Sequence, residues 1–382
     1  MKTNTIAKSE KLRQHTVKLI SILMILATLA ACSPLRAELA AVDYTPQAGQ
    51  DWSISSPAEQ GLDPMLVAEM YHNAAQLETI YSLLVIKNDQ LVAEGYFNEG
   101  TIDQKSLLQS ASKSYISALI GIALDQGCLS NLDQKMMEFF PEYADQISDP
   151  RKKEITIRQL LQMRSGYPWE ETDPALMEAM WAGDNPPLIV HYPLTNDPGA
   201  EFQYSNATSH WLGEIVARSC ETDLKTFAEE NLLSPLGAEM GEFWQDMYAG
   251  YYPLFHLTAR DMAKFGLLYL NEGEYDGNQV ISADWIHDSL QTYSEDAWGY
   301  RVGRNFNDIG YGYQWWSARS GEHEYNLAWG HGGQLIFLVQ DLDMVIVVKS
   351  DPFWMQHDGQ SWKHEKANIN LVADFINALP IE

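Results

Sequence analysis

A serine and a lysine three residues apart, Ser110 and Lys113, stand at the start of a strongly apolar segment that continues to Gln126. On a helix this spacing places the hydroxyl and the amine on the same face, one turn apart. The first helical turn carries unpaired N–H groups and the positive end of the helix dipole, which favour developing negative charge. A lysine in an apolar site loses proton affinity through desolvation, so it can help to deprotonate the serine. The alternative is an N-cap serine beside a lysine that snorkels to the surface.

Two further short motifs lie downstream. A Tyr-Ser-Asn triplet at 204–206 stands just before a predicted helix, and a His-Gly-Gly triplet at 331–333 leads into the predicted strand Gln334–Gln340. With the Ser-x-x-Lys they resemble, in this order, the three motifs of the serine β-lactamase and penicillin-binding-protein superfamily, in its class C-like branch. That branch includes class C β-lactamases, DD-peptidases, family VIII carboxylesterases and 6-aminohexanoate-oligomer hydrolases. The resemblance extends over about residues 55–380.

The resemblance implies roles for individual residues. Ser110 would be the nucleophile, Lys113 and Tyr204 would be its acid–base partners, and the backbone N–H groups of Ser110 and Gln334 would form the oxyanion hole. The residues implied in substrate binding are Asn206, His331, Gly332, Gly333, Tyr167 and Trp169. The third motif departs from the family's Lys-Thr-Gly. Because a neutral imidazole is a poorer anchor for a carboxylate than an ammonium, this departure favours esters and small amides over β-lactams as substrates.

The sequence therefore predicts a serine hydrolase that works through an acyl-enzyme intermediate and needs no metal or organic cofactor. It would resemble a carboxylesterase or a 6-aminohexanoate-oligomer-hydrolase-like amidase. Two alternatives stay open: a DD-peptidase or class C-like β-lactamase acting on peptidoglycan or antibiotics, and a catalytically idle lipoprotein that binds envelope partners. Rival motifs are absent from the sequence, which contains neither a Gly-x-Ser-x-Gly elbow nor a His-Glu-x-x-His pair.

The composition limits the possible partners. The 382 residues include 25 Lys and Arg against 52 Asp and Glu, which gives a formal charge of −27 and a pI near 4.6. Affinity for nucleic acid comes chiefly from basic groups that displace counterions, so the composition argues against a nucleic-acid partner. It argues equally against electrostatic binding to anionic lipid. The expected partner is a small ester or amide, and nothing in the sequence indicates an oligomeric state.

The first 31 residues have the pattern of a bacterial lipoprotein signal peptide. A basic start precedes an apolar stretch at 19–29, which ends in a Leu-Ala-Ala-Cys sequence that resembles a lipobox at Cys32. In lipoproteins the chain is cut before this cysteine, which is then lipidated, and Ser33 implies sorting to the outer membrane. The protein would be anchored through Cys32 on the periplasmic side of that membrane, with residues 32–52 as a tether.

The two other cysteines, Cys128 and Cys220, fall at predicted helix ends. The periplasm permits a disulfide between them. Two buried free thiols are the alternative. Neither cysteine lies in a metal-ligand spacing, so no metal site is expected here.

The order of predicted elements indicates a discontinuous α/β domain. The expected elements are a hairpin at 80–97, a buried helix at 110–126, strands at 311–316, 334–340 and 344–349, and a last helix over Lys366–Leu379. Since antiparallel strands come from both ends of the chain, residues 53–130 and 258–382 are expected to form the sheet domain around a mainly helical insert at 131–257. The resemblance implies a five-stranded antiparallel sheet flanked by helices. The long loop 164–203 is expected to border the cleft, and whether it acts as a lid stays open.

Overall fold

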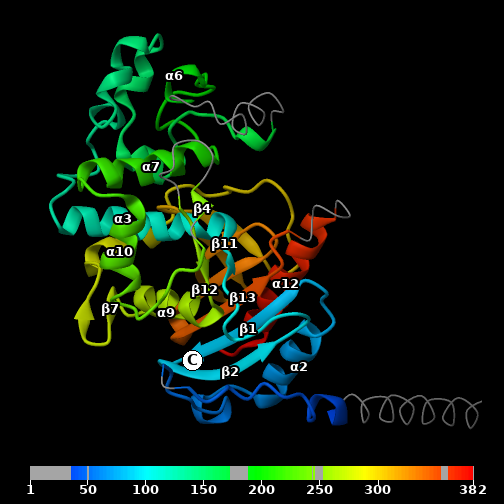
Figure 1. The fold of residues 1–382 in the computed structure, drawn as a ribbon. Helices are drawn as coiled ribbons and strands as arrows, with labels where there is room; N and C mark the ends of the chain where they lie inside the picture. Colours follow the sequence, from blue (N-terminus) through cyan, green and yellow to red (C-terminus); the bar gives the residue numbers. More distant parts are fainter. Residues whose placement is uncertain are drawn as a thin grey trace, which may run out of the picture.

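The computed structural model describes residues 36–49, 51–172, 188–242, 244–245, 253–353 and 360–381. At its centre lies a seven-stranded antiparallel sheet in the order β2-β1-β13-β12-β11-β10-β9 (Figure 1). The strands are β1 (Ile80–Lys87), β2 (Gln90–Tyr96), β9 (Asn307–Tyr311), β10 (Trp316–Ser320), β11 (His323–Gly330), β12 (Gln334–Val339) and β13 (Met344–Ser350). The antiparallel sheet expected from the sequence is confirmed, but the expected count of five strands is wrong.

The additional strands lie at one edge of the sheet. The segment expected as a single strand over 311–316 contains the turn between β9 and β10, in which the N–H of Gly312 donates to the carbonyl oxygen of Trp315 at 2.8 Å. The strand β11 carries polar residues at buried positions, among them His323 and Asn326, so its sequence lacks the regular alternation that indicates a strand. These polar side chains find partners only through contacts with segments distant in sequence.

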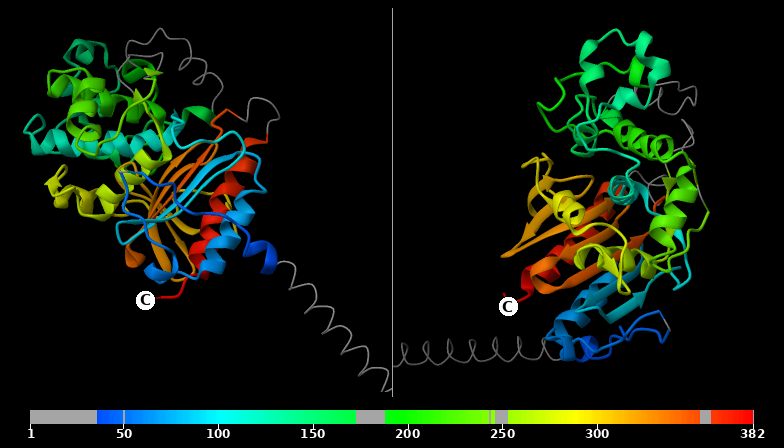
Figure 2. Two further views of the ribbon diagram at one scale, coloured as in Figure 1. Left: turned by 60° about the horizontal axis from the view of Figure 1, so that its bottom comes forward. Right: turned by 90° about the vertical axis from the view of Figure 1, so that its left-hand side faces the viewer.

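Helices cover both faces of the sheet (Figure 2). One face is covered by α2 (Pro64–Ala74) and α12 (Ser361–Ala378), and the other by α3 (Ser112–Asp125) and α9 (Ala259–Leu270). Successive side chains of a strand point to opposite faces, so the central strand β13 feeds two hydrophobic cores. Val345 and Val347 belong to the core under α3 and α9, whereas Ile346 and Val348 belong to the core under α2 and α12.

The mainly helical part stands above the sheet in Figure 1. It follows the short strand β3 (Ser106–Leu107), which pairs with β6 (His256–Leu257) where the chain returns to the sheet. In the described ranges, the α-helices between these strands, besides α3, are α4 (Ile157–Leu161), α6 (Leu188–His191), α7 (Asn206–Ser219) and α8 (Leu224–Ala228). Helix α10 (Ala283–Leu290) comes after the return. Part of the predicted 164–203 loop, residues 173–187, lies outside the described residues, and the question of a lid stays open.

The described part of the predicted tether does not form a free linker. The N–H of Glu94, on β2, donates to the carbonyl oxygen of Tyr44 at 2.9 Å. Arg260 of α9 binds both the carboxylate of Asp51 and that of Glu94, each at 2.8 Å. The expectation of a tether over 32–52 is therefore wrong from Tyr44 onward, because a buried arginine fixes this segment to the sheet. Cys32 and the predicted signal peptide lie outside the described residues.

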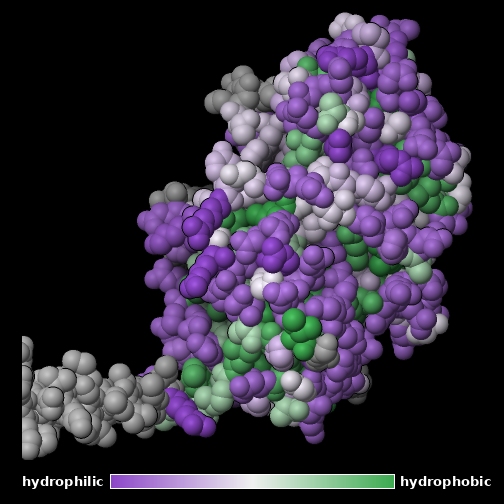
Figure 3. All heavy atoms as spheres, turned by 180° about the vertical axis from the view of Figure 1, so that it is seen from behind, coloured by the Kyte–Doolittle hydropathy of each residue, from purple (hydrophilic) through white to green (hydrophobic). Residues whose placement is uncertain are grey.

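The surface agrees with the acid-rich composition. Viewed from behind, it is mostly hydrophilic, and hydrophobic residues form small separate patches (Figure 3). In the described ranges, no helix combines the length and the apolarity that crossing a membrane requires.

Cys128 and Cys220 form a disulfide, which resolves the choice that the sequence left open. Their Cα atoms lie 5.0 Å apart, and the bond spans 92 residues of sequence. Cys128 follows the end of α3, and Cys220 follows the end of α7, two helices that pack against each other. The disulfide therefore fixes the C-terminal ends of the two helices.

Replacing both cysteines by alanine is expected to lower the free energy of unfolding by about 4 kcal/mol. A cross-link that closes a loop of this length restricts the unfolded chain strongly and so raises its free energy. The check is urea unfolding of the Cys128→Ala/Cys220→Ala variant, followed by circular dichroism, beside the oxidised parent protein. Equal unfolding midpoints for the two proteins would contradict a stabilising cross-link.

Candidate active site

The predicted nucleophile lies in a tight turn directly before α3. Ser110 is the middle residue of the 3₁₀ turn η2 (Gln109–Ala111), so the regular helix begins two residues later than the sequence suggests. Gln109 has a φ of 50°, in the left-handed region that residues with a side chain rarely adopt. A Cβ atom at Gly330 would lie 2.1 Å from the carbonyl oxygen of Leu108, so only glycine allows β11 to approach this turn. The turn is thereby held between helix and sheet.

Lys113 is buried beside the serine. Its Nζ donates hydrogen bonds to Ser110 Oγ at 3.0 Å and to Asn206 Oδ1 at 2.9 Å, and it lies 5.1 Å from the centre of the Tyr204 ring. Only 3% of Lys113 is exposed, so the alternative of a snorkelling lysine is wrong. The structure brings the first two sequence motifs together around one amine, which can take a proton from the serine.

Tyr204 belongs to the same cluster: its ring lies beside Lys113 Nζ, and its hydroxyl is close enough to Ser110 for that side chain to affect the pKa of the phenol. Burial raises the pKa of Tyr204 well above its ordinary value of 10.0, and the nearby carboxylates of Glu171, Glu170 and Glu365 raise it further. The side chain of Ser110 acts in the opposite direction and lowers the pKa of Tyr204. The phenol is therefore protonated at neutral pH, and it can donate a proton before it can accept one.

Glu170 holds the Tyr-x-Asn motif in place, although no sequence signal marks it as a site residue. Its buried carboxylate accepts hydrogen bonds from Ser205 Oγ at 2.6 Å and from the backbone N–H groups of Asn206 and Ala207 at 2.9 and 3.2 Å. The last two belong to the first turn of α7, where free N–H groups favour an anion. Burial raises the pKa of Glu170, although these hydrogen bonds oppose the rise. The neighbouring Glu171 accepts a hydrogen bond from Asn206 Nδ2 at 3.0 Å, which orients the amide oxygen toward Lys113.

The His-Gly-Gly motif forms the turn between β11 and β12. Gly332 and Gly333 both have positive φ values, 79° and 94°, so the turn requires glycine at these positions. A second missed residue, Glu365 of α12, holds this turn: its carboxylate accepts hydrogen bonds from Trp329 Nε1 at 2.6 Å and from the N–H of Gly332 at 2.9 Å. The same carboxylate lies 3.0 Å from His331 Nδ1. The helix predicted from the sequence begins at Lys366, one residue after Glu365, so Glu365 was assigned no role.

The strand after this turn begins at Gln334, which pairs with Gly330 across the turn. The turn η2 that carries Ser110 packs against both β11 and β12. The structure thus places the start of β12 beside the nucleophile, where an oxyanion hole made of the Ser110 and Gln334 N–H groups requires it. The role of these two N–H groups stays a prediction.

The two aromatic residues expected at the cleft differ in position. Tyr167 is fully buried, with its ring 4.8 Å from that of Trp211 and 6.5 Å from that of Tyr192. The expectation that Tyr167 contacts substrate is wrong, because its side chain packs inside the helical part. Trp169 lies next to the site, with its ring 6.0 Å from that of Tyr204.

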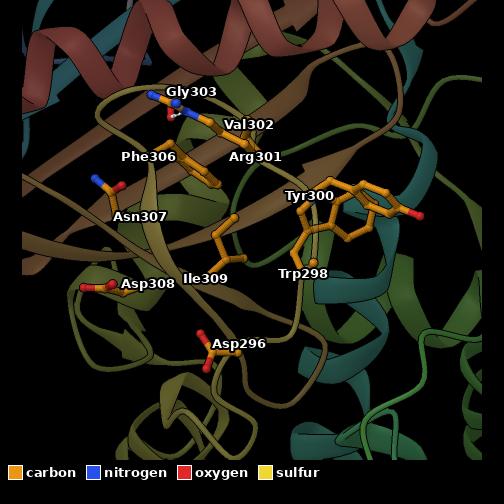
Figure 4. Close-up of a pocket in the computed structure, with 11 residues that line it drawn as sticks. Asp296, Trp298, Tyr300, Arg301, Val302, Gly303, Phe306, Asn307, Asp308 and Ile309 are labelled. Atoms are coloured by element: carbon orange, nitrogen blue, oxygen red, sulfur yellow. Dashed lines mark hydrogen bonds between the residues drawn. The ribbon is translucent and has the colours of Figure 1, made fainter.

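Trp298 is a third aromatic residue near the site, and the sequence analysis did not single it out. Its ring lies 5.5 Å from that of Trp169 and 5.9 Å from that of Tyr300. Trp298 and Tyr300 lie side by side at one end of a pocket of about 310 Å³, which the segment Asp296–Ile309 lines (Figure 4). No sequence signal marks this segment, since its contact with Trp169 joins residues more than a hundred positions apart. The aromatic side chains extend the site away from Tyr204 toward this pocket.

The chain is similar to known proteins over most of its length. The model of the beta-lactamase family matches residues 81–351, which is well over half of the chain. The 6-aminohexanoate-dimer hydrolase of Paenarthrobacter ureafaciens is 27% identical over 311 residues, which cover 76% of each chain. Among solved structures, EstCE1, a hydrolase with promiscuous acyltransferase activity, has a TM-score of 0.65 at 14% identity and covers 85% of this chain and all of its own.

Simvastatin synthase of Aspergillus terreus has a similar fold, with a TM-score of 0.62 at 16% identity, covering 83% of this chain and 99% of its own. At such identities these two structures establish the fold alone. The protein accordingly belongs to the beta-lactamase family, a family of serine hydrolases.

Proposed function

We propose that this protein hydrolyses esters or amides of small substrates through an acyl-enzyme formed on Ser110. The observation that carries the proposal is the position of Lys113 Nζ, 3.0 Å from Ser110 Oγ and 2.9 Å from Asn206 Oδ1. A buried amine that bonds the nucleophile directly is the arrangement that activates a serine. A protein that only binds partners has no need of it, which weighs against a catalytically idle lipoprotein.

Acylation would begin with attack of Ser110 Oγ on the substrate carbonyl carbon, while the serine proton passes to Lys113. Because Tyr204 is protonated at neutral pH, it would donate its proton to the leaving group and regain one from Lys113. The N–H groups of Ser110 and Gln334 would stabilise the oxyanion. Asn206 would hold Lys113, and Trp169 would contact the substrate. Water would then release the acyl group and regenerate the free serine.

The negative charges near Tyr204 favour neutral esters or amides as substrates, rather than β-lactams or peptidoglycan peptides. Three carboxylates, those of Glu170, Glu171 and Glu365, lie close enough to raise the pKa of Tyr204. A carboxylate on the substrate, as found on β-lactams and at the C-terminus of peptides, would be repelled by these charges. The family's Lys-Thr-Gly lysine, which would offset them, is replaced here by His331, whose imidazole already binds Glu365.

A location outside the cytoplasm is part of the proposal. The predicted lipobox at Cys32 and the apolar stretch before it support lipid anchoring at the periplasmic side of the outer membrane. The disulfide between Cys128 and Cys220 supports an oxidising compartment, because such bonds are rare in the reducing cytosol.

The proposal is tested by comparing hydrolysis of p-nitrophenyl acetate and of nitrocefin by the purified protein. We expect kcat/KM for the ester to exceed that for nitrocefin by at least about a hundredfold, since two decades correspond to about 2.7 kcal/mol of discrimination against the carboxylate. The reverse preference would identify a β-lactamase or DD-peptidase. Failure of both substrates, together with failure of a panel of small amides, would favour the idle lipoprotein.

A further inference from the structure

His331, in the turn between β11 and β12, and Glu365 of α12 form a close carboxylate–imidazole pair. Glu365 Oε2 lies 3.0 Å from His331 Nδ1, and the carboxylate is held by two N–H donors, those of Trp329 and Gly332. The Glu365 side chain is 5% exposed, whereas the His331 side chain is 47% exposed. Because a carboxylate can only accept, the proton of a neutral imidazole stays on Nδ1, and Nε2 carries a free lone pair.

A second histidine in the chain shows what a purely structural pair looks like. His323 Nδ1 lies 2.7 Å from Asp341 Oδ2, but its Nε2 lies 3.1 Å from the carbonyl oxygen of Leu379, and its side chain is only 2% exposed. Both nitrogens of His323 are thus occupied within the protein. Among the described residues, none bonds Nε2 of His331, so this nitrogen is available to a molecule in the site.

The position of His331 in the fold brings its turn next to the segment that carries Ser110. His331 belongs to the turn before Gln334, and that turn adjoins the Ser110 segment through Gly330. Across the site, the charge of Glu171 acts on His331, and Glu171 binds Asn206, the partner of Lys113. Glu171 and Glu365 also act on Tyr204, so His331 and the Tyr204 hydroxyl lie within reach of the same two carboxylates.

We propose that His331, positioned by Glu365, is a second catalytic base that activates the water in the deacylation step. The inference rests on the proposed function, since it requires an acyl group on Ser110. In this proposal Lys113 and Tyr204 act in acylation, and His331 acts in hydrolysis of the acyl-enzyme. Glu365 is a positioning residue, which fixes the tautomer and orientation of the imidazole.

The water oxygen forms a bond to the acyl carbon while one water proton passes to His331 Nε2. The bond between that carbon and Ser110 Oγ then breaks, and Oγ takes a proton from Tyr204. His331 returns its proton to Tyr204 through solvent, so the enzyme regains its initial state and water is consumed once for each acyl group released.

The same pair gives deacylation a defined pH dependence. The hydrogen bond to Glu365 is the largest cause that raises the pKa of His331 above its ordinary value of 6.5; burial opposes it, and the charges of Glu365 and Glu171 add to the rise. The base is active only when unprotonated, so deacylation should slow as the pH falls through this raised pKa. This decline is the acidic limb of the pH–rate profile of deacylation. Removing the Glu365 charge should move that acidic limb to lower pH.

The test separates the two half-reactions with p-nitrophenyl acetate. Release of nitrophenolate by excess enzyme in a stopped-flow instrument gives acylation, and loss of the acetylated Ser110 peptide in quench-flow mass spectrometry gives deacylation. The variant His331→Asn keeps an N–H donor for Glu365 but removes Nε2. We expect it to change acylation less than about threefold and to slow deacylation at least about a hundredfold, the range of general-base catalysis.

A second variant, Glu365→Gln, keeps an acceptor for the turn while it removes the charge. We expect its deacylation to show the acidic limb at lower pH than in the parent protein, which a merely structural role would not produce. The control His287→Asn changes an exposed histidine beside Asp288, at 3.9 Å, and should leave both steps unchanged.

The outcomes distinguish the two proposals. Acetylation of Ser110 with normal deacylation in His331→Asn, or with no shift of the limb in Glu365→Gln, would overturn the role of the pair and leave the serine hydrolase standing. Absence of any acetylation at Ser110 in the parent protein would overturn both.

Discussion

Replacing Ser110 by alanine is expected to lower kcat/KM for p-nitrophenyl acetate by about 10⁴-fold or more. The substitution removes the atom that forms the covalent bond, and loss of a serine nucleophile has effects of this size because its partners then lack a role. The remaining contact of Lys113 with Asn206 Oδ1, at 2.9 Å, keeps the amine in place, so the loss reports chemistry. The measurement is steady-state hydrolysis of p-nitrophenyl acetate with substrate in excess. Thermal unfolding of the variant checks that it is folded.

Ser130→Ala is a suitable control, because Ser130 is exposed and lies at the far end of α3 from Ser110. It should retain the activity of the parent protein. If Ser110→Ala kept more than about a tenth of the parent activity, the ester would be cleaved at another site, and an acyl-enzyme on Ser110 could not be the main route.

Replacing Lys113 by methionine is expected to lower the acylation rate by about 10³-fold. Methionine has nearly the length of lysine and suits the apolar surroundings of this buried position, so packing is preserved while the proton acceptor is lost. The unpaired oxygen of Asn206 should cost about 1 to 3 kcal/mol of stability. Because Tyr204 is protonated at neutral pH, it cannot replace the lysine as the first base.

Acylation of Lys113→Met would be followed by stopped flow from pH 6 to 10. The matched control is Lys264→Met, which changes another buried lysine whose Nζ donates to the carbonyl oxygen of Gly237, away from the site. A rate within about threefold of the parent in Lys113→Met would show that Tyr204 removes the serine proton. The division of roles proposed above would then be reversed.

The sequence predicted the elements whose signals are local. Asp63 followed by proline indicates a helix start, and the Asp63 carboxylate indeed accepts from the N–H of Met65 at 2.8 Å, at the beginning of α2. The hairpin of β1 and β2 has short apolar runs around a turn at Asn88 and Asp89, which both have positive φ. Such features depend on neighbours in sequence and can be read from the chain directly.

The parts that could not be predicted depend on contacts between distant segments. Glu170 and Glu365 look like ordinary acidic residues, yet each is buried because N–H donors from elsewhere in the chain surround it. Ser110 and Lys113 could be singled out from their helical spacing, but Tyr204 and His331 were identified only through the resemblance to a family, since their distance along the chain does not determine their distance in the fold. The same reasoning explains why Arg260 and the docked N-terminal segment escaped prediction.

The place of β13 in the sheet has a consequence for how the protein is made. This strand lies between β1 and β12, but roughly 250 residues separate it from β1 along the chain. At ribosomal speeds of about 5 to 20 residues per second, the first hairpin would wait about 10 to 50 s for its partner. During that interval one side of β1 exposes unpaired N–H and C=O groups, which can pair with other nascent chains. We therefore expect this topology to make the chain depend on chaperone protection during synthesis.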